Sequence, residues 1–111
     1  MTEKLTEPRL EQVLEFCALE PVERVFLEDV ARRGLGRCIA LRGDDGALAA
    51  VCHVGANVVP SGRGCGAFAD DASRGQARMI IGEERAVGEL WAAAAGAGVA
   101  VIGRASCRER V

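Results

Sequence analysis

The sequence is poor in aromatic side chains and has almost no lysine. Aromatic residues make up 4% of the 111 residues and tyrosine is absent, although hydrophobic residues reach 50% and glycine occurs 14 times. A core of such small side chains buries little apolar area per residue, so at this size its stability is marginal. We therefore expect a partner surface. The chain has thirteen arginines and one lysine, a ratio that is typical of a GC-rich bacterial genome.

The sequence also lacks a basic run and a long apolar run. Without clustered positive charge it does not have the pattern of a nucleic-acid-binding protein. No stretch approaches the roughly 18 apolar residues that a membrane span needs. The N-terminus, MTEKLTEPRLEQ, is polar and acidic, which excludes a signal peptide. We expect a cytoplasmic protein.

Metal ligands and catalytic pairs are missing as well. The cysteines are widely separated and form no C-x-x-C pair, so we interpret them as buried thiols of a reducing compartment. His53, the single histidine, directly follows Cys52, and neighbours in a strand point to opposite faces. We expect a structural histidine, no metal site and no catalytic residue. The cysteines outside the C-terminal tail are Cys17, Cys38, Cys52 and Cys65.

The last ten residues, IGRASCRERV, resemble the translation of a common sequencing adapter at all ten positions. We interpret residues 102–111, with the fifth cysteine, as an artefact and not a domain. Without its three arginines and one glutamate the chain has 11 basic and 15 acidic residues, a net charge of about −4. On this interpretation residues 1–101 are one domain of a truncated longer protein.

Hydrophobic spacing predicts two helices at the start of the chain. Leu10, Val13, Leu14 and Cys17 form one apolar stripe, and Pro8 suits the first turn of that helix. A second helix is predicted to open at Pro21, with a basic last turn and a glycine stop. Its apolar stripe is Val22, Val25, Phe26 and Val30, and its end is Arg32, Arg33 and Gly34.

The remainder predicts strands that alternate with helices. A short strand, Arg37–Arg42, is followed by the turn sequence GDDG and one long return strand over residues 47–59. Gly55 interrupts that strand and Pro60 ends it. A helix at 67–74, a strand at 78–81 and a helix at 83–95 complete the order α-α-β-β-α-β-α. The fold class is α/β with a mainly antiparallel sheet.

The glycine-rich stretch 61–66, SGRGCG, leads into a predicted helix, which is the layout of a phosphate cradle. Arg63, Gly64 and Gly66 are the candidate cofactor-binding residues, with Arg63 able to clamp a phosphate. A plain connection of small residues is the alternative. The loop has no P-loop lysine, and Ser61 and Ser73 have no histidine at a recognisable spacing.

The element order resembles the first two-thirds of the GNAT fold of Gcn5-related N-acetyltransferases. In that fold acetyl-CoA lies along a splayed strand, and its pyrophosphate meets a loop of the form R/Q-x-x-G-x-G/A. Four stretches are similar to a domain of unknown function that precedes the catalytic domain in some bacterial GNAT proteins. They are PVERVFLEDVARRGLG, ALAAVCHVGANVVP, AFADDASRGQARMIIGEERAV and GELW.

The resemblance implies a degenerate, truncated GNAT-like lobe. Arg63 and Gly66 match the loop motif, but Phe68 stands where glycine or alanine is expected. The lobe would be non-catalytic and would hold no cofactor, while acetyl-CoA would serve the acetyltransferase domain that follows in the full-length chain. Two alternatives stay open, a regulatory lobe that binds acyl-CoA and a free-standing protein-interaction domain. The acyl acceptor and the oligomeric state are not implied.

Overall fold

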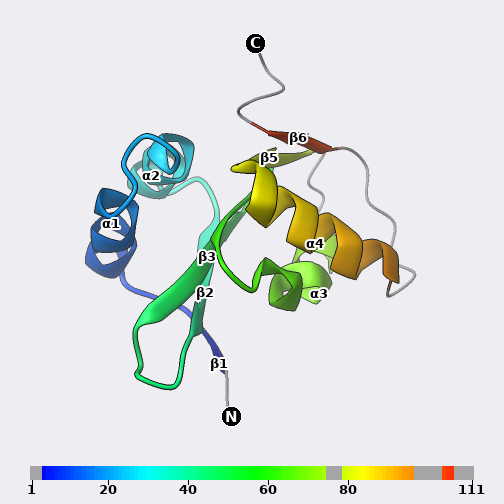
Figure 1. Cartoon of the computed structure of the whole chain (residues 1–111). Coiled ribbons are helices and arrows are strands. Elements are labelled where there is room, and N and C mark those ends of the chain that lie inside the picture. Colours follow the sequence, from blue (N-terminus) through cyan, green and yellow to red (C-terminus); the bar gives the residue numbers. More distant parts are fainter. Residues whose placement is uncertain (1–3, 75–78, 97–103, 107–111) are drawn as a thin grey trace.

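The strands of the chain form one mixed sheet with helices on both faces (Figure 1). The computed structural model describes residues 4–74, 79–96 and 104–106. Within these residues the elements are β1 (Lys4–Thr6), α1 (Leu10–Ala18), α2 (Val25–Arg33), β2 (Arg37–Arg42), β3 (Leu48–Val54), β4 (Val58–Gly62), the 3-10 helix η1 (Cys65–Phe68), α3 (Ala69–Arg74), β5 (Ile80–Gly82), α4 (Glu84–Gly96) and β6 (Arg104–Ser106).

The strands lie side by side in the order of the chain, from β1 to β6. Strands β1 to β4 are antiparallel, and β5 and β6 continue the sheet in parallel. The α/β class and the mainly antiparallel sheet are therefore confirmed. The sequence did not predict β1, β4 as a separate strand, or β6. Strand β6 lies in the C-terminal tail and pairs with β5.

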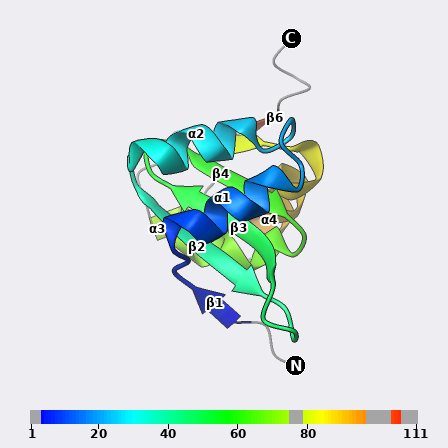
Figure 2. The same ribbon diagram turned by 90° about the vertical axis from the view of Figure 1, so that its left-hand side faces the viewer.

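Helices α1 and α2 cover one face of the sheet (Figure 2). Val13 and Cys17 are buried as their helical spacing predicts, whereas Leu10 is 49% exposed. The second helix begins at Val25, later than predicted. Residues 19–24 form turns before it, and the N-cap residue Arg24 donates from its Nη1 to the Phe16 carbonyl (2.7 Å).

The later start changes which residues of α2 are buried. Leu27 and Ala31 face the sheet, while Val22 and Val25 of the predicted stripe are 83% and 57% exposed. The end of the helix is as predicted, since Gly34 adopts a left-handed conformation (φ 64°) after Arg32 and Arg33. The buried cluster of this layer comprises Val13, Phe16, Cys17, Leu27, Ala31, Ala40, Val51 and Val59.

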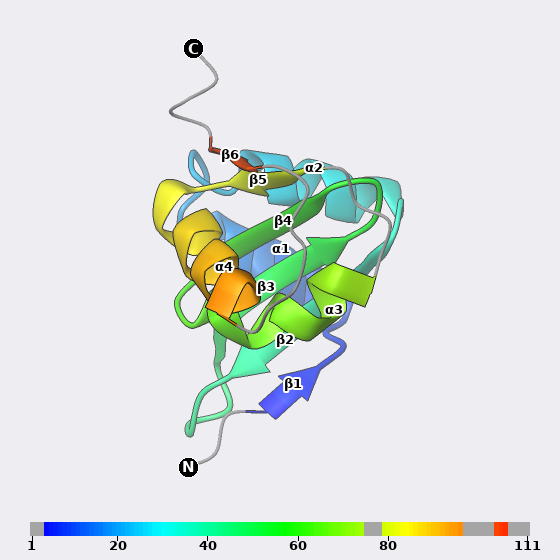
Figure 3. The same ribbon diagram turned by 90° about the vertical axis from the view of Figure 1, so that its right-hand side faces the viewer.

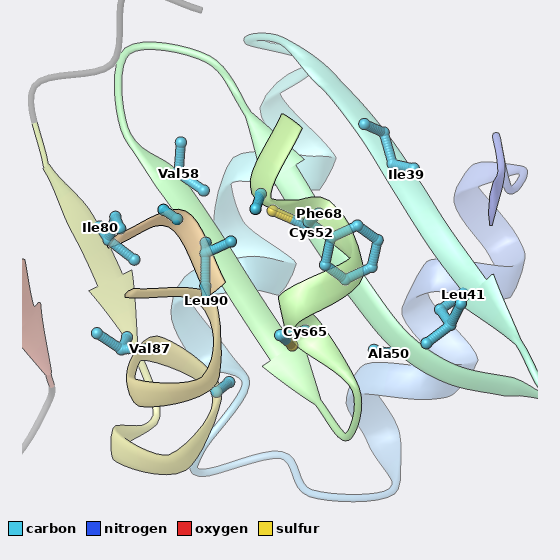
Figure 4. Packing of buried hydrophobic residues seen from close by; sticks show 13 residues of the cluster. Ile39, Leu41, Ala50, Cys52, Val58, Cys65, Phe68, Ile80, Val87 and Leu90 are labelled. Carbon is cyan, nitrogen blue, oxygen red and sulfur yellow. The ribbon is translucent and has the colours of Figure 1, made fainter. Parts of the chain in front are cut away.

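Helices α3 and α4 cover the other face and enclose the larger core (Figure 3). Phe68 belongs to this cluster and points from η1 over the sheet, on the side of Ile39 and Leu41 (Figure 4). The many small side chains of the sequence allow α4 to approach η1 closely. A Cβ built on Gly66 would lie only 3.1 Å from the Ala93 Cβ. The largest members of the cluster are Ile39, Leu41, Val58, Phe68, Ile80, Val87 and Leu90.

The prediction of one long return strand is wrong. The chain turns back at residues 55–57, where the Gly55 N–H donates to the Asn57 carbonyl (3.1 Å), and β4 pairs antiparallel with β3. Pro60 lies inside β4 and does not end it. The Val58 N–H points toward β5. An N–H at position 60, two residues later in the strand, would point the same way. Because β5 pairs with β4 only at Val58, Pro60 leaves no hydrogen bond unmade.

His53 is buried on the α2 side of the sheet, and only 3% of it is exposed. Its Cε1 lies 3.0 Å from the Cβ positions that side chains on Gly36 and Gly55 would occupy. In the described part of the chain neither ring nitrogen has a hydrogen-bond partner. Burial lowers the pKa of His53, because the desolvated ring disfavours the charged form. The prediction of a structural histidine agrees with this surrounding.

We expect stability to fall in mild acid because of His53. Its pKa is lower in the folded than in the unfolded state, so the unfolded chain takes up the proton first. The free energy of unfolding is then unaffected above about pH 7.5 and decreases as the pH falls through about 6.5, by at most ~1.4 kcal/mol per pH unit. Urea unfolding between pH 5 and 8 measures this slope. His53→Gln should flatten it, and an unchanged slope in that variant would contradict the assignment.

Candidate functional site

The candidate loop joins β4 to η1, beside the first turns of α4 (Figure 3). Gly62 and Gly64 both have positive φ values, of 100° and 90°, which glycine adopts without strain. The successive N–H groups of Gly64 and Cys65 point to one acceptor, as in an anion-binding nest. Such a backbone could bind an anion. Whether an external anion can bind depends on which groups already accept hydrogen bonds from these N–H groups.

Glu89 of α4 accepts two of these hydrogen bonds. Its Oε1 lies 3.0 Å from the Gly64 nitrogen and 3.2 Å from the Cys65 nitrogen. The Arg63 N–H donates to the Ala49 carbonyl of the neighbouring strand (3.0 Å). A carboxylate that accepts two backbone N–H bonds makes charge-assisted hydrogen bonds, the strong kind. The chain therefore supplies its own anion to the loop.

Glu83, between β5 and α4, binds the start of the same loop. Its Oε2 accepts from the Ser61 hydroxyl (2.8 Å), and its Oε1 accepts from the Gly62 N–H (3.4 Å). The Arg24 Nε lies 3.9 Å from Oε2, and both side chains are largely buried, with 11% and 15% exposed. Arg24 also stacks on the Phe16 ring at 3.8 Å. This carboxylate ties the ends of β4 and β5 to the α1–α2 connection.

A pocket of about 530 Å³ opens next to Glu83, where charged residues of both signs face one another. Arg63 lines this pocket, whereas Gly64 is bound by Glu89 and Gly66 packs against α4. The structure therefore brings the three candidate residues into one loop but not around one cavity. The lining residues are Glu20, Glu23, Arg24, Gly62, Arg63, Glu83, Glu84 and Arg85.

The four cysteines in the described part of the chain are free thiols, and three of them are buried. Burial, with Glu89 and Glu83 nearby, raises the pKa of the Cys65 thiol to about 12. Burial, with Glu28 nearby, raises the pKa of Cys17 to about 11. Protonated thiols are poor nucleophiles and poor metal ligands. Across residues 4–74, 79–96 and 104–106, no three His, Cys, Asp or Glu side chains are placed so that they could hold a metal ion.

The hydroxyl of Ser61 is bonded to a carboxylate and not to a histidine. Within the described part of the chain His53 makes no side-chain hydrogen bond, so it does not activate this serine. Both carboxylate oxygens of Glu83 accept hydrogen bonds from its own loop. The sequence placed Glu83 in the first turn of a helix but did not indicate its contact with the loop, or that of Glu89.

Comparison with known proteins gives one match. A family model described as "Domain of unknown function (DUF4081)" matches residues 38–103, a range that contains the loop and both carboxylates. The prediction of a domain of unknown function is thereby confirmed. No curated protein and no solved structure matches the chain. None of the described helices is long and apolar enough to cross a membrane.

Proposed function

The chain belongs to the family of the domain of unknown function DUF4081, and we propose that it is the non-catalytic N-terminal lobe of a GNAT-type N-acetyltransferase. Residues 1–101 form the lobe in this proposal, and residues 102–111 are adapter-derived. The catalytic domain, with its acetyl-CoA, follows in the full-length bacterial protein. The free thiols support a reducing, cytoplasmic location.

The contact of Glu89 with the loop is the observation that carries the proposal. In the GNAT fold the pyrophosphate of acetyl-CoA meets the loop that leads from a splayed strand into a helix. In this chain the Gly64 and Cys65 N–H groups of the corresponding loop already bind Glu89. A pyrophosphate would have to displace this carboxylate, and negative charges a few ångströms apart repel each other.

The surroundings of the loop oppose acetyl-CoA in two further ways. Strands β4 and β5 pair at Val58 and Ile80, and they stay close beyond that pair, because a Cβ on Gly82 would lie 2.7 Å from the Pro60 carbonyl oxygen. Glu83, directly after β5, links that strand to the end of β4 by its hydrogen bonds to Ser61 and Gly62. Phe68, in place of a small residue, is fully buried in the core. The residues present do not fit acetyl-CoA, which supports a lobe without acyl-transfer chemistry.

Calorimetric titration with acetyl-CoA tests the proposal. We expect no binding by the wild-type chain up to about 1 mM, a limit that corresponds to roughly 4 kcal/mol of binding free energy. An acyl-CoA-binding regulatory lobe would instead bind in the micromolar range and lose affinity in Arg63→Ala, because Arg63 is the exposed cation of the loop. Wild-type binding that Arg63→Ala weakens would overturn the proposal that this lobe binds no acetyl-CoA and would favour the regulatory lobe.

An independent nucleotide read across codon 101 distinguishes the proposed lobe from the remaining alternative, a free-standing interaction domain. We expect the reading frame to continue into a GNAT catalytic domain with an R/Q-x-x-G-x-G/A motif. A stop codon shortly after residue 100, with no such motif downstream, would favour a free-standing interaction domain. The same read tests the adapter interpretation, since the codons for IGRASCRERV should be absent from it.

A further inference from the structure

The pocket next to Glu83 lies where two neighbouring parallel strands end. Strand β4 ends at Gly62 and β5 ends at Gly82, and because the two strands are parallel, their carboxyl ends point the same way. Helix α4 begins there, and the connection between α1 and α2 supplies the other lining residues. Ligands of α/β sheets commonly bind beyond the carboxyl ends of the strands. The volume of about 530 Å³ is typical of a small-molecule site.

The two largely buried charges of this pocket are fixed by the chain itself. Arg24 donates to the Phe16 carbonyl (2.7 Å) and stacks on the Phe16 ring. Glu83 accepts from Ser61 and Gly62, and its Oε2 lies 3.9 Å from the Arg24 Nε. Side chains that are held by such contacts keep their position when a ligand enters, which is what a binding site requires of its base.

Four exposed side chains of the same pocket carry unpaired charges of both signs. The acids Glu20 and Glu23 come from the α1–α2 connection. The cations are Arg63, from the loop after β4, and Arg85, from the first turn of α4. Among residues 4–74, 79–96 and 104–106 none of the four makes an ion pair, although they line one pocket. A space between separated charges of opposite sign suits a ligand that carries both signs.

We propose that this pocket binds a free amino acid with a basic side chain. Arg63 and Arg85 would hold the carboxylate of the ligand, because guanidinium groups pair with carboxylates in a bidentate geometry. Its α-ammonium group and its side-chain cation would meet the carboxylates of Glu20 and Glu23. A ligand of one sign would leave two of these charges without a partner, which costs binding free energy. The binding is reversible and involves no acyl transfer, so it does not depend on the proposed GNAT assignment.

Calorimetric titration of the intact chain with L-lysine tests the site. We expect saturable binding with a Kd below about 1 mM. Two analogues each lack one charged group, since cadaverine is lysine without its carboxylate and aminocaproate is lysine without its α-amino group. Each should bind more weakly by about tenfold or more, because part of the pocket charge stays unpaired. No saturable binding of L-lysine up to about 10 mM, or equal affinity for either analogue, would overturn the proposal.

Matched variants locate the binding in this pocket. Arg85→Gln and Glu20→Gln each remove one pocket charge and should weaken L-lysine binding by about tenfold, with circular dichroism showing both variants folded. Arg74→Gln and Glu11→Gln make the same changes at exposed positions outside the pocket and should keep the affinity within about twofold. Arg85→Gln should leave the weak binding of cadaverine unchanged, because cadaverine has no carboxylate.

Two outcomes of this series would contradict the site. One is a loss of L-lysine affinity in the control variants equal to that in the pocket variants. The other is a loss in Arg85→Gln that is as large for cadaverine as for L-lysine. The acetyl-CoA titration is a separate measurement, and acetyl-CoA binding would overturn the proposed function while leaving these outcomes to decide the amino-acid site.

Discussion

Phe68→Ala is expected to lower the free energy of unfolding by about 3–5 kcal/mol, the usual cost of removing a fully buried aromatic ring. Phe68 has no exposed surface and packs from η1 over the sheet, within the larger core cluster (Figure 4). The same cluster includes Ala50, Ala86 and Cys65, whose short side chains cannot extend into the space that the ring leaves. In a domain with a marginal core this loss is a large part of the total stability.

Urea unfolding followed by circular dichroism measures this loss. Phe26→Ala is the matched control, since Phe26 is half-buried at the edge of the α1–α2 cluster and should cost about half as much. If Phe68→Ala costs less than Phe26→Ala, the ring contributes less to the core than its burial indicates. The same ring anchors η1 on the sheet, so its loss should also release the loop that precedes η1.

Gly62→Ala is expected to cost about 3 kcal/mol or more, because strain and a backbone clash act together. Gly62 has a φ of 100°, and a Cβ there would lie 2.4 Å from the Ala49 carbonyl oxygen and 2.8 Å from the Ala50 Cα. Relief would require β4 to move away from β3, which would also separate the Gly62 N–H from Glu83.

Gly46→Ala is the control for strain alone. Gly46 has a comparable φ of 84°, but a Cβ there meets no atom within 4 Å, so about 1 kcal/mol is expected. The difference between the two variants, measured by urea unfolding, isolates the close approach of β4 to β3. Equal costs would mean that the strands separate without penalty and that Gly62 serves only as a turn residue.

Local patterns in the sequence were sufficient for much of the fold. The spacing of Val13 and Cys17 gave α1, the glycine at 34 gave the end of α2, and the GDDG turn gave the β2–β3 hairpin. The turn at residues 55–57 was missed because Gly55 in an apolar run also fits a bulge. A proline at position 60 predicts a strand end, because only the pairing of β5 shows that its missing N–H is not needed.

The candidate site was predicted only as far as local geometry allows. Glycine at positions 62 and 64 permits the positive φ values of the loop, and Arg63 is exposed beside them. The partners of the loop come from α4, about 25 residues later in the chain, so no local pattern marks Glu89 as the acceptor. The packing of α4 on η1 decides the site, and a sequence pattern for an anion cradle cannot distinguish an internal anion from an external one.

The claim that Glu89 takes the place of a phosphate is tested most directly by the NMR chemical shifts of the loop amides. Inorganic pyrophosphate is titrated into the labelled wild-type chain, into Glu89→Ala, and into Glu84→Ala as a variant with the same charge loss on the same helix. We predict that the Gly64 and Cys65 amide resonances respond saturably only in Glu89→Ala, where the two N–H groups lose their acceptor. A saturable response in the wild-type chain, or none in Glu89→Ala, would contradict the account.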